Sequence, residues 1–133
     1  MELNELTYMI NGCAMIVHRQ LGTGFQEVIY QRSLAIELAK ANIPHARETE
    51  QTIFYDGKNV GSRRADFIVN GQVVLEIKAC ITLEDVHLAQ IKNYVNIYDL
   101  PIGLLINFGA KSLQFKKIFN PRYNPAPVAE SGF

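Results

Sequence analysis

The sequence predicts an α+β, mixed α/β domain, with a central mixed sheet flanked by helices in the order ααβββαββ. Three observations predict this class. Apolar residues recur at helical spacing through the first 41 residues. Between residues 46 and 79 the pattern changes to short β-favouring runs separated by turn dipeptides. A third helical stretch and two further apolar runs follow, so helices stand on both sides of the strands in the sequence.

Length and composition predict a single folded domain. The chain has 133 residues, of which 48% are hydrophobic, and its 13 Lys and Arg balance 13 Asp and Glu. Nearly half of the chain can be buried, which argues against disorder. The zero net charge argues against binding of nucleic acid or anionic membrane by bulk charge alone, so any polyanion site must be local. We expect one domain over residues 1–119 and an extended, proline-containing tail over 120–133.

The cysteines and the N-terminal segment predict a cytoplasmic protein. Cys13 and Cys80 lie far apart, and neither has a thiol or histidine at metal-ligand spacing, so we interpret both as reduced thiols. Glu2 and Glu5 occupy the segment in which a signal peptide needs cations. No apolar stretch approaches the ~18 residues of a membrane span, so we expect no membrane partner.

Three amphipathic helices are expected. The first covers residues 3 to about 20, and a Gly-Thr-Gly turn ends it. Thr23 and Gln26 have the spacing of a capping box, which predicts that they open a second helix running to about residue 41. The third helix is expected over residues 82–99.

Five strands are expected. Residues 46–79 read as a three-stranded antiparallel meander with turns at Asp56-Gly57 and Asn70-Gly71. After the third helix, residues 102–108 and 112–119 form two further apolar runs, which we interpret as strands. The predicted sheet therefore receives strands from both sides of the third helix.

One strand of the meander carries charge on a buried face. Side chains alternate along residues 73–79, so Val74, Glu76 and Lys78 share one face. Burying a charge costs several kcal/mol unless it is paired or binds a metal. Two interpretations remain open from the pattern alone, a structural Glu–Lys ion pair at a sheet edge and a metal site.

A second acid lies in the preceding strand, at Asp66. A two-residue turn at Asn70-Gly71 would place Asp66 opposite Leu75, on the face away from Glu76. A three-residue loop ending in Gly71 would place Asp66 opposite Val74, diagonal to Glu76 and on its face. We expect the odd-length loop, and with it two carboxylates on one face of the sheet.

Two pairs of helical residues are candidates for the same site. Gln90 and Tyr94 are four residues apart and share a face of the third helix, and Glu27 and Tyr30 are three apart on the second. Each residue also has a structural interpretation. The tyrosines can be aromatics at the core edge, Glu27 a partner of the helix dipole, and Gln90 a solvated helix residue.

These motifs together resemble a known family. The segment HRQLGTGFQEVIYQRSLAIEL is similar to the signature of the small bacterial GxxExxY proteins, although the family's turn usually carries Gly-Pro-Gly. RADFIVNGQVVLEIKA resembles the PD-(D/E)xK core of the nuclease superfamily, with Ala65 in place of proline before Asp66. QIKNY resembles the QxxxY motif of its RecB-like branch. The resemblance runs from His18 to Phe108 and implies a restriction-endonuclease-like core.

The resemblance implies a magnesium site. Asp66, Glu76 and the backbone carbonyl of Ile77 would hold Mg²⁺, with Mn²⁺ as a substitute, and Glu27 would contribute from the second helix. This donor set fits the ion, because Mg²⁺ prefers oxygen ligands and keeps several waters. Lys78 would orient or deprotonate the attacking water and stabilise the charge that develops on phosphate.

The resemblance also implies contacts to nucleic acid. It gives substrate-positioning roles to Gln90, Tyr94, Tyr30 and His18. Apart from the resemblance, Arg63 and Arg64 are expected to bind nucleic acid and to assist the metal ion in attracting phosphate. For the histidine, packing within the helix is an equally open interpretation.

The sequence therefore favours a Mg²⁺-dependent nuclease that hydrolyses phosphodiester bonds in nucleic acid, with DNA as the first candidate. One alternative is a non-catalytic module that retains the nuclease fold and binds nucleic acid or protein. Another is a charged face that is a structural ion-pair network without a ligand. Because the domain is small, we expect a homodimer or a protein partner to assist in substrate selection.

Overall fold

The computed structural model describes residues 1–123. The predicted order ααβββαββ is confirmed, and the elements are α1 (Leu3–Leu21), α2 (Glu27–Lys40), β1 (His45–Tyr55), β2 (Lys58–Val69), β3 (Val73–Lys78), α3 (Asp85–Ile97), β4 (Ile102–Asn107) and β5 (Gln114–Phe119). The predicted extended tail falls mostly on residues 124–133, which lie outside the described residues.

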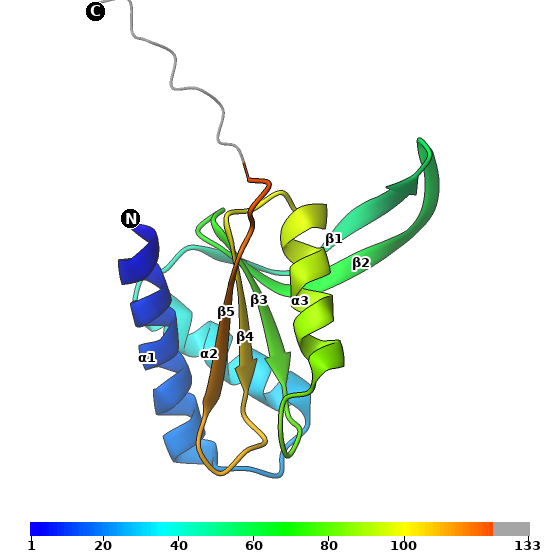
Figure 1. Ribbon diagram of the computed structural model, residues 1–133. Helices are drawn as coiled ribbons and strands as arrows, with labels where there is room; N and C mark the ends of the chain where they lie inside the picture. Colours follow the sequence, from blue (N-terminus) through cyan, green and yellow to red (C-terminus); the bar gives the residue numbers. More distant parts are fainter. Residues whose placement is uncertain (124–133) are drawn as a thin grey trace, which may run out of the picture.

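The five strands form one mixed sheet in the order β1-β2-β3-β4-β5 (Figure 1). Neighbouring strands pair antiparallel except β3 and β4, which are parallel. Helix α3 makes the crossover between these two strands, as a parallel pair requires. The central strands β3 and β4 are buried on both faces, which explains their nearly continuous apolar sequences.

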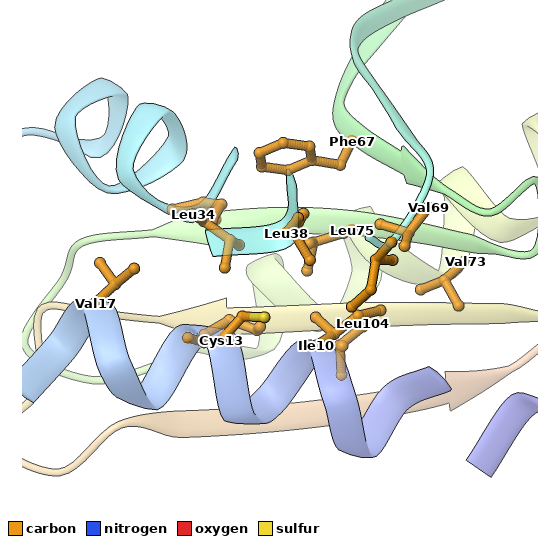
Figure 2. Close-up of a cluster of buried hydrophobic side chains, with 14 of the residues drawn as sticks. Ile10, Cys13, Val17, Leu34, Leu38, Phe67, Val69, Val73, Leu75 and Leu104 are labelled. Atoms are coloured by element: carbon orange, nitrogen blue, oxygen red, sulfur yellow. The ribbon is translucent and has the colours of Figure 1, made fainter. Parts of the chain in front are cut away.

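Helices α1 and α2 cover one face of the sheet. Figure 2 shows their apolar side chains packed against inward-pointing residues of β2, β3 and β4. The labelled members of this cluster are Ile10, Cys13, Val17, Leu34, Leu38, Phe67, Val69, Val73, Leu75 and Leu104. Each fully buried aliphatic side chain contributes about 1.5–3 kcal/mol, so this cluster is the main source of stability.

Helix α3 covers the opposite face. Its Ile91 and Val95 are buried against Val74 and Leu105 of the central strands. Close approach depends on Gly103 in β4, where an added Cβ would lie 2.6 Å from Cγ1 of Val95 and 2.8 Å from Cγ1 of Ile91. The missing side chain at Gly103 therefore sets how closely the helix packs on the sheet.

The outer parts of β1 and β2 extend beyond the sheet as a two-stranded ribbon, residues 50–64 (Figure 1). Strand β3 pairs with β2 only over residues 67–69, so this ribbon has no third strand. All residues from 54 to 64 are exposed. The predicted turn at Asp56-Gly57 closes the ribbon, with φ of 53° and 74°, as a two-residue hairpin turn requires.

The turn between α1 and α2 differs from the prediction. Helix α2 begins at Glu27 with Gln26 as its N-cap, and no side chain caps it, so the predicted capping box at Thr23 is wrong. The turn is instead stabilised from inside the fold, because the hydroxyl of the fully buried Tyr30 donates a hydrogen bond to the Gly22 carbonyl, with an O–O distance of 2.6 Å. A buried tyrosine hydroxyl needs such a partner.

Both cysteines are free thiols, as predicted, with Cys13 buried and Cys80 partly exposed. In residues 1–123, no helix combines the length and apolar character needed to span a lipid bilayer.

Candidate active site

The loop between β2 and β3 sets the position of the two candidate carboxylates. Val69 pairs with Val73, which leaves a three-residue loop and confirms the predicted odd length. The loop ends at Gln72 rather than at Gly71, so residues of β2 pair with β3 residues two positions further along than predicted. Continued along the strands, this register places Asp66 beside Glu76 instead of opposite Val74.

One hydrogen bond joins Asp66 to Glu76, and a second joins Asp66 to the next residue, Ile77. The backbone N–H of Asp66 donates to Oε1 of Glu76 over 3.0 Å, and the backbone N–H of Ile77 donates to Oδ2 of Asp66 over 2.7 Å. Side-chain oxygens thus take the place of carbonyl oxygens where the ladder between β2 and β3 ends. We call this point, defined by Asp66 and Glu76, the seam.

Strand β2 turns away from β3 at the seam. Phe67 packs in the cluster under α1 and α2, whereas Ala65, two residues earlier, packs in the cluster under α3. Strict alternation would place both on one face, so the strand twists strongly at Asp66. Beyond it, the N–H of Ala65 donates to the Tyr98 hydroxyl over 2.9 Å instead of to β3. Beyond the seam, where the ribbon begins, β2 therefore no longer pairs with β3.

Burial and charge make the seam electrostatically unusual. Burial of the Glu76 side chain, followed by the negative charge of Asp66, raises the pKa of Glu76 to about 9, although the charge of Lys78 acts in the opposite direction. Among residues 1–123 the only ion pair joins Lys40 and Glu37. The alternative of a structural ion pair at the seam is therefore wrong for this part of the chain.

A second layer of polar residues holds Asp66 from the α2 side. Nε2 of the buried Gln31 donates to Oδ1 of Asp66 over 3.0 Å, and Nη2 of Arg47 donates to Oε1 of Gln31 over 3.1 Å. Sequence reasoning missed both residues. In the sequence, the only local signal for a role of Gln31 is that a polar residue lies on a helix face next to core positions. Arg47 has no such signal.

Glu27 reaches the neighbourhood of the seam from the first turn of α2. A cavity of about 140 Å³ is lined by Glu27, Val28, Gln31, Glu48 and Asp66. Sequence reasoning also missed Glu48, which has φ of 51° within β1, a conformation that costs a non-glycine residue of order 1–3 kcal/mol. Such strain is often found at functional sites, which makes this acid a candidate member of the site.

The donor atoms at the seam suit a hard divalent cation. Two neighbouring carboxylates, one of them 8% exposed, lie beside the Ile77 backbone, and neither forms an ion pair with any residue from 1 to 123. Within residues 1–123, no three His, Cys, Asp or Glu side chains lie close enough together to hold a metal by themselves. Two carboxylates with backbone and water oxygens are nevertheless a sufficient set for Mg²⁺.

The family model of the PD-(D/E)XK nuclease superfamily matches residues 4–118, which is most of the chain and includes every residue of the seam. The chain belongs to the PD-(D/E)XK nuclease superfamily. Members of this superfamily are typically metal-dependent and act on nucleic acid, in agreement with the oxygen donors at the seam. The finer predicted membership, in the GxxExxY branch, remains a prediction.

A solved structure shares the fold of this chain. The chain is similar to the crystal structure of SSO0001, with a TM-score of 0.56 and 23% sequence identity over 70% of this chain. It spans 49% of the length of SSO0001. No curated protein has significant similarity to the sequence.

In this superfamily member, three of the predicted nucleic-acid contacts lie together. Arg63 of the ribbon lines one cavity with Gln90 and Tyr94 of α3. Arg64 does not line this cavity, because neighbouring residues of a strand point to opposite faces, and its Cα partner is Glu50. The two arginines, predicted as equivalent, are therefore placed differently relative to α3.

Two other predicted positioning residues have packing roles in the nuclease fold. Tyr30 is fully buried and stacks on Phe108 with ring centroids 4.8 Å apart, so its ring cannot reach a substrate in this structure. Nε2 of His18 lies 3.0 Å from the Ala110 carbonyl oxygen and holds the connection that follows β4. These contacts give both residues a packing role, and a positioning role for substrate stays a prediction.

Proposed function

We propose that this chain is a Mg²⁺-dependent phosphodiesterase that hydrolyses nucleic acid, with DNA as the first substrate to test. The observation that supports this most directly is the seam, where Asp66 of β2 lies beside Glu76 of β3 and Lys78 follows Glu76 by two residues. Superfamily membership supports the same reaction class, and the free cysteines agree with a reducing, cytoplasmic location.

Asp66, Glu76 and the Ile77 carbonyl would hold Mg²⁺ or Mn²⁺, with Glu27 reaching the site from α2. When bound, the ion lowers the pKa of a coordinated water and neutralises charge on the scissile phosphate. Gln31 fixes the Asp66 carboxylate by its hydrogen bond, which keeps one oxygen of that group oriented. The protein thus orients the ligands before the ion binds.

Lys78 is proposed to orient the attacking water and to stabilise the extra negative charge on phosphorus-bound oxygen. Its charge already acts on Glu76, since it opposes the rise of the Glu76 pKa. Hydrolysis adds the water oxygen to phosphorus, breaks one ester P–O bond, and leaves the released sugar oxygen to take up a proton. Gln90 and Tyr94 would hold the substrate backbone.

We also infer membership of the GxxExxY branch, because the structure supplies a physical reason for each signature residue. Gly24 has φ of 102°, which glycine adopts readily. Glu27 is the first residue of α2 and lines the cavity beside Asp66. Tyr30 bonds the turn from inside the core.

The test is incubation of the purified full chain with supercoiled, linear and single-stranded DNA and with RNA, in Mg²⁺, Mn²⁺ or EDTA. We expect cleavage that needs the divalent ion and falls by at least about 100-fold in Glu76→Gln and Lys78→Ala. Lys111→Ala is the matched control, because this exposed lysine lies in the connection between β4 and β5.

Metal-dependent cleavage that survives both substitutions would contradict the proposed site. An absence of cleavage, combined with divalent-ion binding that Asp66→Ala abolishes, would instead support the non-catalytic alternative. Binding of nucleic acid that depends on salt but not on the divalent ion would indicate a plain binding module.

A further inference from the structure

A groove separates the ribbon from α3. The cavity has a volume of about 340 Å³, and its lining includes Ile53 and Arg63 from the ribbon and Gln90, Asn93 and Tyr94 from the helix. Apolar surface and hydrogen-bonding side chains therefore face each other across it. None of the lining residues carries a negative charge.

One residue of the groove, Tyr94, lies within electrostatic range of the seam. Burial raises the pKa of the Tyr94 hydroxyl, the negative charges of Glu76 and Asp66 raise it further, and the positive charge of Arg63 lowers it. Tyr94 is thus within electrostatic range of both the carboxylates and the arginine, and it lines the groove itself. A strand bound in the groove would therefore lie near the seam.

The chemistry of the lining suits a phosphate with an attached base. Arg63 has no carboxylate partner among the ion pairs of residues 1–123, so its guanidinium is free to bind phosphate. The amides of Gln90 and Asn93 can bond base edges or sugar, and the Tyr94 ring offers a stacking surface. This combination of one cation, amides and an aromatic ring is typical of sites for single strands.

The size of the groove distinguishes a single strand from a duplex. A cavity of about 340 Å³ is at the small end of pockets that hold a compact organic ligand. A B-form duplex is much too wide to enter such a cavity, because its major groove alone is about 12 Å across. We infer that the groove between the ribbon and α3 holds one strand of nucleic acid, with Arg63 as its phosphate contact.

This inference rests on the proposed nuclease function and adds the form of the substrate and a groove that binds it. The chain contains its own control, because Arg63 and Arg64 are adjacent and both exposed. Only Arg63 lines the groove. If positive charge acted only at long range, loss of either arginine would weaken binding equally. If Arg63 contacts phosphate in the groove, loss of Arg63 would weaken binding more than loss of Arg64.

The experiment measures binding by fluorescence anisotropy, with labelled single strands of about 12 thymidines or uridines and a duplex of the same length. Glu76→Gln serves as the background, so that cleavage does not consume the probe. We expect a single strand to bind more tightly than the duplex. In that background, Arg63→Ala should weaken single-strand binding about tenfold and reduce the salt slope by about one, and Arg64→Ala should change binding less than about twofold.

Arg63→Lys should recover part of the affinity, which a purely structural role of the side chain would not predict. Equal losses from Arg63→Ala and Arg64→Ala, or a duplex that binds as tightly as both single strands, would overturn the inference. Tighter binding of either DNA or RNA supports it and identifies the substrate class. Cleavage by the unmodified chain is measured separately, so a failure of the proposed function is distinguishable from a failure of the groove.

Discussion

The central strand β3 and the ribbon differ in almost every physical respect. Residues 73–77 of β3 are buried, and the strand is paired on both edges. Residues 54–64 of the ribbon are all exposed, and its two strands pair only with each other. The seam lies between these regions. Glu76 is thus proposed to act from the buried strand β3 and Asp66 from the point where β2 leaves it, while the ribbon supplies surface for the substrate.

The largest effect is expected from a cavity in the buried region. Leu75 is fully buried between the sheet and α1 and α2, so Leu75→Ala should lower the free energy of unfolding by about 2–5 kcal/mol. Val60→Ala is the matched truncation in the ribbon, and with 61% of Val60 exposed it should cost less than about 0.5 kcal/mol. Urea unfolding measures both, and similar losses would mean that the ribbon is part of the core.

The second effect concerns the seam itself. The pKa of Glu76 is about 9 in the folded chain and about 4.5 when unfolded, so the folded chain holds an extra proton between these values. The stability from this proton is complete below pH 4.5 and is lost as pH rises through 9. Glu76→Gln has no such proton, and its amide can also donate to Asp66. Near pH 10, the free energy of unfolding of Glu76→Gln should therefore be about 1–3 kcal/mol higher than that of the parent chain.

Urea unfolding between pH 4 and 10 in EDTA checks this expectation. Addition of Mg²⁺ should then stabilise the parent chain near neutral pH but have little effect on Glu76→Gln, because the metal competes with the proton for the same oxygens. If the two proteins have parallel pH profiles in EDTA, Glu76 does not titrate as its burial implies.

The base of the ribbon should respond more weakly. The Tyr98 hydroxyl accepts a hydrogen bond from the N–H of the fully buried Ala65 and donates one to the Thr49 carbonyl. Tyr98→Phe leaves that N–H without a partner and should cost about 1–2 kcal/mol. Amide hydrogen exchange should accelerate at Ala65 and along the ribbon, with Tyr55→Phe as the exposed control. Unchanged protection in the variant would show that the ribbon does not depend on this anchor.

Much of the fold could be predicted because its signals are local. The Asp56-Gly57 turn, the alternation around Glu76 and the helical spacing of α1 each depend on a few neighbouring residues. The start of α2 could not be predicted in this way. It depends on a hydroxyl that becomes available only when Tyr30 is buried, so a plausible capping pattern at Thr23 had no bearing on the structure.

The candidate site likewise has some features with local sequence signals and others without them. The pairing of Asp66 with Glu76 follows from loop length, and a displacement of one residue in the loop still brings the two acids together. Gln31 approaches Asp66 only because α2 packs beside the sheet. Glu48 approaches Asp66 only because its backbone in β1 has a left-handed conformation. Neither event has a short-range signature. The unequal placement of Arg63 and Arg64 likewise required the position of α3.

The smallest effect on stability is expected at the tip of the ribbon. Phe54 and Tyr55 are 65% and 76% exposed, although aromatic residues usually bury much of their area. If the ribbon acts only as a binding surface, Phe54→Ser and Tyr55→Ser should each change the free energy of unfolding by less than about 0.5 kcal/mol. A thermal melt of each variant tests this. A loss as large as that of Tyr98→Phe would mean that the tip packs against the protein, and the division between a rigid strand and an exposed ribbon would no longer hold.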